Sequence, residues 1–279
     1  MKDYKRDLQL CILEIVKDID KVCKKHNIEY FLAYGSVLGA VRHQGFIPWD
    51  DDFDIMIKYE QYNEFLEACQ KDLDPNKYFV QTPETEPSYY LSFAKIRNIK
   101  TTLIEEGNKY ENITNGVYVD VFPLVGVPNS KIKRKILEIN RAFALSANRN
   151  VINSKFLYSI FKIFLKIFGK KRILKYSTKE CLKYKCNDYE NCVSIFDGDG
   201  FDLNVVSNKV LGKPKYVKFE DIKLPIPNDS DSYLKKIYGE YMQIPSPKQI
   251  EAKTHTPYIL DLKHSYKEYK EINENKKIK

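Results

Sequence analysis

The sequence lacks the features of a membrane-spanning or exported protein. No stretch approaches the roughly 18 uncharged apolar residues that a membrane-spanning helix needs. The charged segment 1–6 is not followed by the apolar region of a signal peptide. The six cysteines include no C-x-x-C pair, a pattern that is typical of reduced thiols and not of a disulfide framework. We therefore expect a cytoplasmic protein.

Three of the cysteines leave a zinc site open as an alternative. Cys181, Cys186 and Cys192 lie near one another in the sequence, but their spacings are looser than those of common zinc motifs. Reduced structural thiols are therefore the simpler prediction.

The sequence also lacks a recognised nucleic-acid-binding motif, an internal repeat and a low-complexity linker. Its net charge is +8, from 46 basic and 38 acidic residues. A positive charge of this size suits nucleotide substrates or an anionic membrane surface. Because no motif accompanies the charge, we expect no nucleic-acid partner.

The residues that are present are sufficient for a sizeable core, since 43% of the 279 residues are hydrophobic. Apolar residues recur with helical spacing in some segments and with strand spacing in others. The predicted helices lie at residues 5–25, 37–43, 60–69, 131–150, 155–172 and 230–241. The predicted strands lie at residues 28–33, 52–57, 78–81, 91–98 and 116–124.

The segment 34–57, YGSVLGAVRHQGFIPWDDDFDIMI, joins a glycine-serine turn to an acidic strand. Gly35 and Ser36 follow an apolar strand and open a helix, so their backbone N–H groups should attract phosphate oxygens. Strand alternation puts Asp52 and Asp54 on one face. Neighbouring carboxylates repel each other unless a divalent cation lies between them. Mg²⁺, which also binds substrate phosphates, is the expected ion, with Mn²⁺ as the alternative.

Two other interpretations of the acidic run fit less well. A solvated acidic loop would rarely alternate with residues such as Phe53 and Ile55. A calcium-binding EF-hand loop would begin at Asp50, but it would then have Ile55 where the motif needs glycine and Gln61 where it needs glutamate.

Two later strands carry further charged residues. Lys95 and Arg97 lie two residues apart on one face of the strand 91–98, where we expect them to neutralise phosphates, although both would also suit an exposed edge strand. Asp120 lies within the apolar strand 116–124, where an uncompensated carboxylate costs several kcal/mol. We expect Asp120 to bind metal, with a strand-end cap as the alternative.

The segment 155–172, KFLYSIFKIFLKIFGKKR, is too short and too cationic to span a bilayer, yet it is unusually apolar for a surface helix. It would lie either in the membrane interface, with its lysines directed toward lipid headgroups, or in the protein core, with its lysines along one edge. Its sequence leaves both interpretations open.

The order of a Gly-Ser turn, an apolar-flanked D-x-D motif and a third strand aspartate resembles the polymerase-beta-like nucleotidyltransferase superfamily. The block AYGSVLGAVRHQGFIPWDDDFDI more closely resembles the LicD family of phosphotransferases. The likeness continues through residues 95–105, 116–124 and 224–242, and it is weak between 130 and 215.

The resemblance implies an α+β fold, with a nucleotidyltransferase-like mixed sheet flanked by helices and a mainly helical C-terminal part. We assign the catalytic core to residues 1–128 and expect residues 129–265 to complete the same unit and to face the acceptor and the membrane. Residues 266–279, which are mostly Lys, Glu and Asn, are expected to form a disordered tail.

The resemblance also implies transfer of a substituted phosphate, typically phosphocholine from CDP-choline. The acceptor would be a sugar hydroxyl of a lipid-linked surface glycan such as teichoic acid, lipopolysaccharide or capsule, at the inner face of the cytoplasmic membrane. Most members of the superfamily transfer the nucleotide itself, whereas this family is thought to release the nucleotide monophosphate. The implied metal-binding and catalytic residues are Asp52, Asp54 and Asp120, and the implied substrate-binding residues are Gly35, Ser36, Arg42, His43, Lys95 and Arg97.

Several alternatives remain at this stage. Fukutin-type relatives transfer ribitol phosphate, so CDP-ribitol or CDP-glycerol would also be a suitable donor. A D-x-D nucleotide-sugar glycosyltransferase needs neither the Gly-Ser turn nor the third aspartate, and an inactive membrane-peripheral binding subunit would not need all three aspartates. If the donor carries choline, aromatic side chains should enclose its ammonium group, and Trp49 is a candidate.

Overall fold

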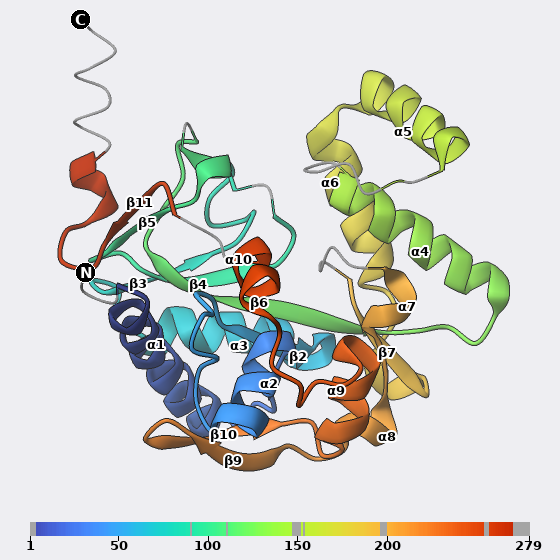
Figure 1. Ribbon diagram of the computed structural model, residues 1–279. Helices are drawn as coiled ribbons and strands as arrows, with labels where there is room; N and C mark the ends of the chain where they lie inside the picture. The colour runs from blue at the N-terminus through green and yellow to red at the C-terminus, as the bar shows by residue number, and fades with distance from the viewer. Residues whose placement is uncertain are drawn as a thin grey trace, which may run out of the picture.

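A long and almost completely buried strand, β6 (Val117–Gly126), lies at the centre of the fold (Figure 1). Its β-branched valines favour extended backbone and pack well in a sheet. The computed structural model describes residues 4–89, 91–109, 111–146, 152, 154–195, 200–253 and 257–269.

Strands on both edges of β6 complete a mixed sheet. β2 pairs with β6 in parallel, whereas β4 pairs antiparallel along its other edge, and the order is β1-β2-β6-β4-β3. The far end of β6 pairs with β7, which pairs with β8. The bounds are β1 (Phe31–Leu32), β2 (Asp54–Lys58), β3 (Tyr78–Gln81), β4 (Ala94–Asn98), β7 (Asn191–Ser194) and β8 (Val205–Ser207).

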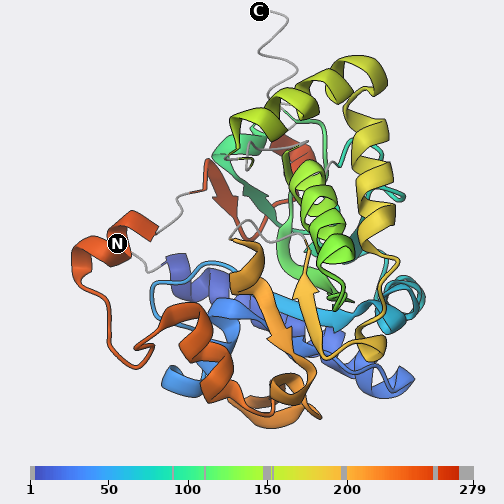
Figure 2. The ribbon, with the colours of Figure 1, turned by 90° about the vertical axis from the view of Figure 1, so that its right-hand side faces the viewer.

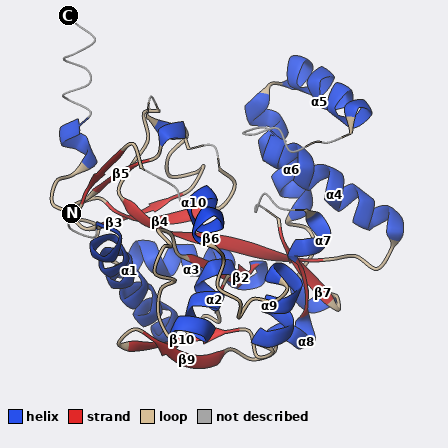
Figure 3. Cartoon of the chain, viewed as in Figure 1, coloured by secondary structure: helices blue, strands red, loops and turns tan. Residues whose placement is uncertain are grey.

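Helices cover this sheet and two small two-stranded sheets flank it (Figure 3). β9 (Lys215–Phe219) pairs with β10 (Ile222–Ile226), and β5 (Thr102–Ile104) pairs with β11 (Ile259–Asp261). The α-helices are α1 (Tyr4–His26), α2 (Tyr34–His43), α3 (Tyr59–Asp72), α4 (Lys131–Ser146), α5 (Lys155–Phe168), α6 (Lys170–Cys181), α7 (Phe201–Asn204), α8 (Asn208–Leu211), α9 (Ser230–Tyr238) and α10 (Pro247–Lys253). Short 3₁₀ turns are η1 (Glu106–Asn108) and η2 (Cys186–Asp188).

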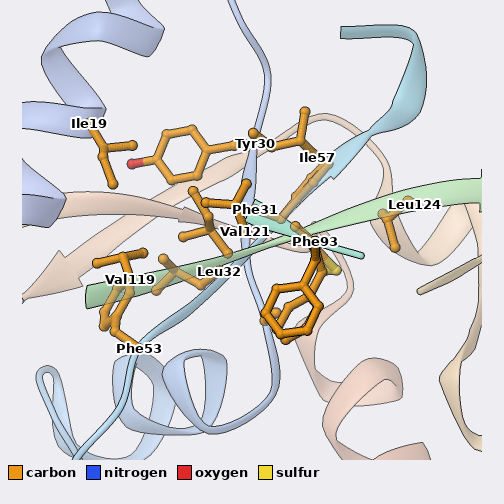
Figure 4. Close-up of a cluster of buried hydrophobic side chains, with 14 of the residues drawn as sticks. Ile19, Tyr30, Phe31, Leu32, Phe53, Ile57, Phe93, Val119, Val121 and Leu124 are labelled. Carbon is orange, nitrogen blue, oxygen red and sulfur yellow. The ribbon is translucent and has the colours of Figure 1, made fainter. Parts of the chain in front are cut away.

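The main core forms where α1 packs against β6. Figure 4 shows Ile19 of α1 and Val119 and Val121 of β6 in the same apolar cluster. The buried face of α1 repeats at helical spacing, as its sequence predicts. This core thereby fixes β6, the strand with which the acidic strand β2 pairs.

The β9–β10 hairpin joins the C-terminal half of the chain to this core. Phe219 makes edge-to-face contacts with Phe46 and Phe53, at ring-centroid distances of 5.0 and 5.4 Å. Glu220 accepts a hydrogen bond from the backbone N–H of Phe46 and forms an ion pair with Arg6 at 2.7 Å. These contacts hold the loop that precedes the acidic segment.

The α+β fold is confirmed, with one refinement for the C-terminal part. That part has many helices, but it also contributes β7 and β8 to the central sheet. Cys181, Cys186 and Cys192 are fully buried, and among the residues that the structure describes they form no cluster of three metal ligands. The structure therefore favours structural thiols over a zinc site.

Three predicted segments differ from the structure. The strand predicted over 52–57 begins only at Asp54, so Asp52 lies before it. The single helix predicted over 155–172 is divided into α5 and α6 at Gly169, whose φ of +75° is readily adopted by glycine. The disordered tail was placed too early, because Tyr266 is buried and its hydroxyl lies 3.3 Å from Thr114 Oγ1. Residues 270–279 of that predicted tail lie outside the described residues.

Within the described ranges, no helix is both long enough and apolar enough to cross a bilayer.

Gly116 offers a direct test of the close packing between β4 and β6. A Cβ added there would lie 2.0 Å from the backbone oxygen of Asn98, on the paired strand. We expect Gly116→Ala to lower the free energy of unfolding by about 1–3 kcal/mol or more, as overpacking does. Urea titration followed by circular dichroism measures this loss. Gly107→Ala is the matched control, since a Cβ there meets nothing within 4 Å, and equal stability of the two variants would contradict the packing.

Candidate active site

A cleft of about 1300 Å³ lies over the start of β2 and the adjoining part of β6. Its walls come from α2, the 47–54 segment, β4, β6 and the region around α9. Six of the nine residues that the sequence assigned to the site line this cleft: Gly35, Arg42, Asp52, Asp54, Lys95 and Asp120.

The predicted acidic triad lies on one wall of the cleft. Asp54 and Asp120 are direct partners in the parallel pairing of β2 with β6, so their side chains leave the sheet on the same face. Asp52 precedes Asp54 by two residues and lines the same cleft. Asp52 lies just before β2, which begins at Asp54. Pairing of β2 with β6 aligns Asp54 with Asp120, and the segment before β2 brings Asp52 to the same cleft.

Asp120 is compensated in part by a buried lysine. Lys95 Nζ lies 2.7 Å from Asp120 Oδ1, and the two residues are opposite each other in the β4–β6 pairing. Burial raises the pKa of Asp120 to about 6, although Lys95 opposes this shift, and the nearby charges of Glu105 and Asp52 add to it. The Asp120 carboxyl therefore titrates at a pH only slightly below neutral.

Arg97 has a different place from the one that the sequence suggested. The Arg97 side chain is only 1% exposed, and Arg97 is not among the described residues that line the cleft. Its Nη1 donates to the carbonyl oxygen of Gly116 at 2.8 Å, and its guanidinium carbon lies 4.8 Å from the centroid of the Tyr118 ring. Lys95 Nζ lies 3.4 Å from the same ring. Arg97 thus supports Tyr118 and is not a substrate contact in this conformation.

The Gly-Ser turn forms the start of α2. Ser36 Oγ accepts a hydrogen bond from the backbone N–H of Asp54 at 2.9 Å, and the Ser36 N–H donates to the carbonyl oxygen of Ala33. Ser36 therefore positions the acidic strand and does not line the cleft itself. Gly35 does line it, and a Cβ at this position would lie 2.8 Å from Asp50 Oδ2. A side chain at position 35 would therefore displace the Asp50 carboxylate.

Tyr34, which the sequence did not single out, is held by residues from far along the chain. Its φ of +45° lies in the left-handed region, which is uncommon for a residue with a Cβ. The Tyr34 N–H donates to Tyr233 Oη at 3.2 Å, and the Tyr34 hydroxyl donates to Asn204 Oδ1 at 2.7 Å. No sequence signal links positions so distant, so only the structure reveals that they fix the turn.

Asp50 is a second site residue that the sequence did not assign. Single carboxylate oxygens of Asp50, Asp51 and Asp52 all lie within 4.8 Å of one another. Burial, and then the charges of Asp52 and Asp51, raise the pKa of Asp50 to about 8. Gln9 of α1 donates to the carbonyl oxygen of Asp50 at 3.0 Å and holds the turn. The alternation of Asp50 with Asp52 was the available signal, because it continues the pattern of the triad.

Arg42 and His43 lie at the end of α2 and contact the Trp49 ring. Arg42 Nε donates to His43 Nε2 at 2.9 Å, and burial followed by the Arg42 charge lowers the pKa of His43, which favours this neutral acceptor. His43 does not appear among the described residues that line the cleft. The Arg42 guanidinium carbon lies 5.7 Å from the Trp49 ring centroid. A cation of the protein itself therefore lies against Trp49.

Comparisons with known proteins show which proteins this chain is similar to. Residues 27–151 match the family described as "LicD/FKTN/FKRP, nucleotidyltransferase domain". The lipopolysaccharide cholinephosphotransferase LicD of Haemophilus influenzae is 28% identical over 260 residues, which cover 86% of this chain and 92% of that protein. Uncharacterised proteins of Rickettsia prowazekii and Rickettsia typhi are each 49% identical over 51 residues, 18% of this chain.

The region that matches the family contains the Gly-Ser turn, the acidic segment and β6 up to its end at Gly126. It therefore includes all three carboxylates of the predicted triad as well as Lys95. The resemblance that the sequence motifs indicated is confirmed, because the chain contains a LicD-family nucleotidyltransferase domain over residues 27–151.

Proposed function

We propose that this protein moves phosphocholine from CDP-choline onto a sugar hydroxyl of a lipid-linked cell-surface glycan, such as lipopolysaccharide, teichoic acid or capsule. The observation that carries this proposal is the alignment of Asp52, Asp54 and Asp120 on one wall of a large cleft, beside Lys95 and the Gly-Ser turn. Similarity to a lipopolysaccharide cholinephosphotransferase supports the choice of donor and acceptor.

The residues of the cleft fit a hard divalent cation. Its wall offers carboxylate oxygens, which Mg²⁺ prefers, and the close approach of Asp50, Asp51 and Asp52 concentrates negative charge. The raised pKa of Asp50, about 8, indicates that this charge is poorly compensated by the protein alone. We propose that Asp52, Asp54 and Asp120 hold Mg²⁺, with Mn²⁺ as the alternative and Asp50 as a further oxygen ligand.

The reaction would be an in-line displacement at the phosphorus that carries the choline. The sugar oxygen forms a bond to this phosphorus, the bond to the oxygen of the nucleotide breaks, and CMP leaves. The bound metal would neutralise the charge of the donor diphosphate and of the leaving group. Such charge compensation is the main requirement of phosphoryl transfer.

The protein side chains supply the remaining steps. Asp120 would accept the proton of the sugar hydroxyl, since its pKa of about 6 leaves much of it ionised at neutral pH. Lys95, at 2.7 Å, holds the Asp120 carboxylate in place. The Gly35 backbone at the start of α2 and the Arg42 side chain would bind donor phosphate oxygens.

The choline group would lie against aromatic side chains of the cleft. Trp49 alone is a weaker candidate than the sequence suggested, because Arg42 already contacts its ring. Tyr238 and Tyr241, from the end of α9 and the turn after it, also line the cleft. We propose these two rings as the aromatic contacts of the ammonium group.

Purified protein incubated with Mg²⁺ and a panel of donors tests the proposed function. The panel contains CDP-choline, CDP-ethanolamine, CDP-ribitol, CDP-glycerol and nucleotide sugars, and the measurement is release of CMP or of a nucleoside diphosphate. Preferred release of CMP from CDP-choline is expected. Preference for CDP-ribitol or CDP-glycerol would change the donor, and release of nucleoside diphosphate from a nucleotide sugar would indicate a glycosyltransferase.

Replacement of the triad carboxylates tests the proposed metal ligands. We expect Asp52→Asn or Asp54→Asn to lower CMP release by orders of magnitude at saturating Mg²⁺ without a loss of fold, because the charge is lost and the side-chain volume is kept. Asp221→Asn is the control, since this surface residue pairs with Lys17 away from the cleft. Near-normal activity of either triad variant would refute the assignment.

The raised pKa of Asp50 predicts how stability depends on pH. Its carboxyl titrates near 3.8 in the unfolded chain and near 8 in the fold, so the folded state binds the extra proton and loses stability as pH rises between these values. We expect Asp50→Asn, which mimics the protonated form, to gain stability relative to the metal-free wild type by at least about 1 kcal/mol between about pH 5.5 and about pH 8. Urea unfolding in EDTA measures the difference. A difference that does not change with pH would contradict the shift.

A further inference from the structure

Helix α5 presents three different faces to its surroundings. By helical spacing, Phe156, Ile163 and Ile167 share one face, whereas Lys155, Lys162 and Lys166 share another. The remaining face contains Phe161, which is the one buried residue of the helix. A simple amphipathic surface helix would have only two faces, one toward the core and one toward water.

The Phe161 face accounts for the attachment of α5 to the protein. Phe161 is 1% exposed and packs in a small cluster with Phe143 of α4 and Ile173 of α6. The ring centroids of Phe143 and Phe161 are 5.2 Å apart. The core interpretation of the 155–172 segment is therefore correct for this face alone.

Within the part of the chain that the structure describes, the second apolar face lacks such cover. Phe156 is 77% exposed, Ile163 is 57% exposed and Ile167 is 64% exposed. By helical spacing, Phe164 lies between this face and the Phe161 face, and Phe168 lies on the Phe161 side; they are 42% and 48% exposed. We call these five residues the α5 surface. Adjacent large apolar side chains at such exposure mark an interaction surface.

The charge beside the α5 surface has one sign. The lysine face of α5 is followed by Lys170, Lys171 and Arg172 at the start of α6, and the sequence has no Asp or Glu from 155 to 179. Lysine side chains beside an apolar face can place their stems on apolar material and their ammonium groups in a polar layer. This combination is complementary to an anionic lipid surface.

The position of α5 in the fold leaves its exposed face accessible. In two perpendicular views α5 lies at the outer edge of the molecule, beyond α4 and α6 and away from the central sheet (Figure 1 and Figure 2). At 14 residues the helix is about 21 Å long, shorter than the roughly 30 Å hydrocarbon core of a bilayer. It can therefore lie along a membrane but cannot cross one.

We propose that the α5 surface docks onto an anionic lipid bilayer, with its apolar residues in the interface and the flanking lysines on the headgroups. The apolar face makes a nucleic acid a poor partner, because no charged or hydrogen-bonding group would meet it. The cluster of like charges makes a second copy of the chain a poor partner, because two such faces would repel each other. Membrane docking is independent of the donor and the reaction, so it stands even if the proposed function is wrong.

Sedimentation with lipid vesicles tests the proposal on the full chain. Wild-type protein should bind vesicles of phosphatidylglycerol and phosphatidylcholine at low salt, and should bind phosphatidylcholine vesicles much more weakly. The double variant Ile163→Ser with Ile167→Ser should bind anionic vesicles at least about tenfold more weakly. Leu10→Ser is the matched control, because Leu10 is 44% exposed on α1, and it should bind as the wild type does.

A charge variant separates the electrostatic component of vesicle binding from the apolar component. Replacement of Lys155, Lys162 and Lys166 by Gln should weaken binding on the order of a hundredfold and should reduce its dependence on salt. Far-UV circular dichroism and urea unfolding show that each variant is folded. Phe161→Ser, by contrast, removes a core side chain and should lower stability.

Two results would overturn the proposal. One is wild-type protein that does not bind anionic vesicles at low salt. The other is a lipid-free dimer, seen by analytical ultracentrifugation, that the Ile163→Ser and Ile167→Ser substitutions dissociate, since the α5 surface would then be a contact between copies. Loss of vesicle binding with full CMP release from CDP-choline would separate docking from catalysis.

Discussion

The pairing of β2 with β6 is the constraint on which the candidate site depends. Parallel register sets Asp54 opposite Asp120 in a sheet whose other residues form the core, so two carboxylates face the same cleft. Charges of one sign in a buried setting are costly. Lys95 compensates Asp120 in part, and we propose a divalent cation as a further partner of the acidic cleft.

Residues distant in sequence hold this arrangement in place. The Gly-Ser turn is fixed from one side by Tyr233 and Asn204, through hydrogen bonds to Tyr34. Glu220, at the tip of the β9–β10 hairpin, fixes the following loop by its contacts with Arg6 and the Phe46 backbone. The first and last parts of the chain therefore build a single cleft.

Similar helical patterns have different outcomes in α1 and α5. Both helices repeat apolar residues on more than one turn, and α1 buries them because β6 lies beside it. α5 contacts a cluster of limited size around Phe161, so its further apolar residues remain exposed. A periodic pattern indicates that a face will be covered, but it does not identify the covering partner.

The sequence by itself determined the local chemistry. Alternation around Phe53 was sufficient to predict that Asp52 and Asp54 belong to one site, and both line the same cleft. The order of motifs was sufficient to predict the family match. The tertiary structure alone decided which charged residues meet in the cleft. The Arg97 guanidinium lies against the Tyr118 ring, and Ser36 accepts a hydrogen bond from the Asp54 backbone. Asp50, by contrast, lies beside Asp52 in the site. Strand pairing and long-range hydrogen bonds set these neighbours. Periodicity fixes the direction of a side chain from its own strand or helix, but contacts between distant segments depend on how those segments pack.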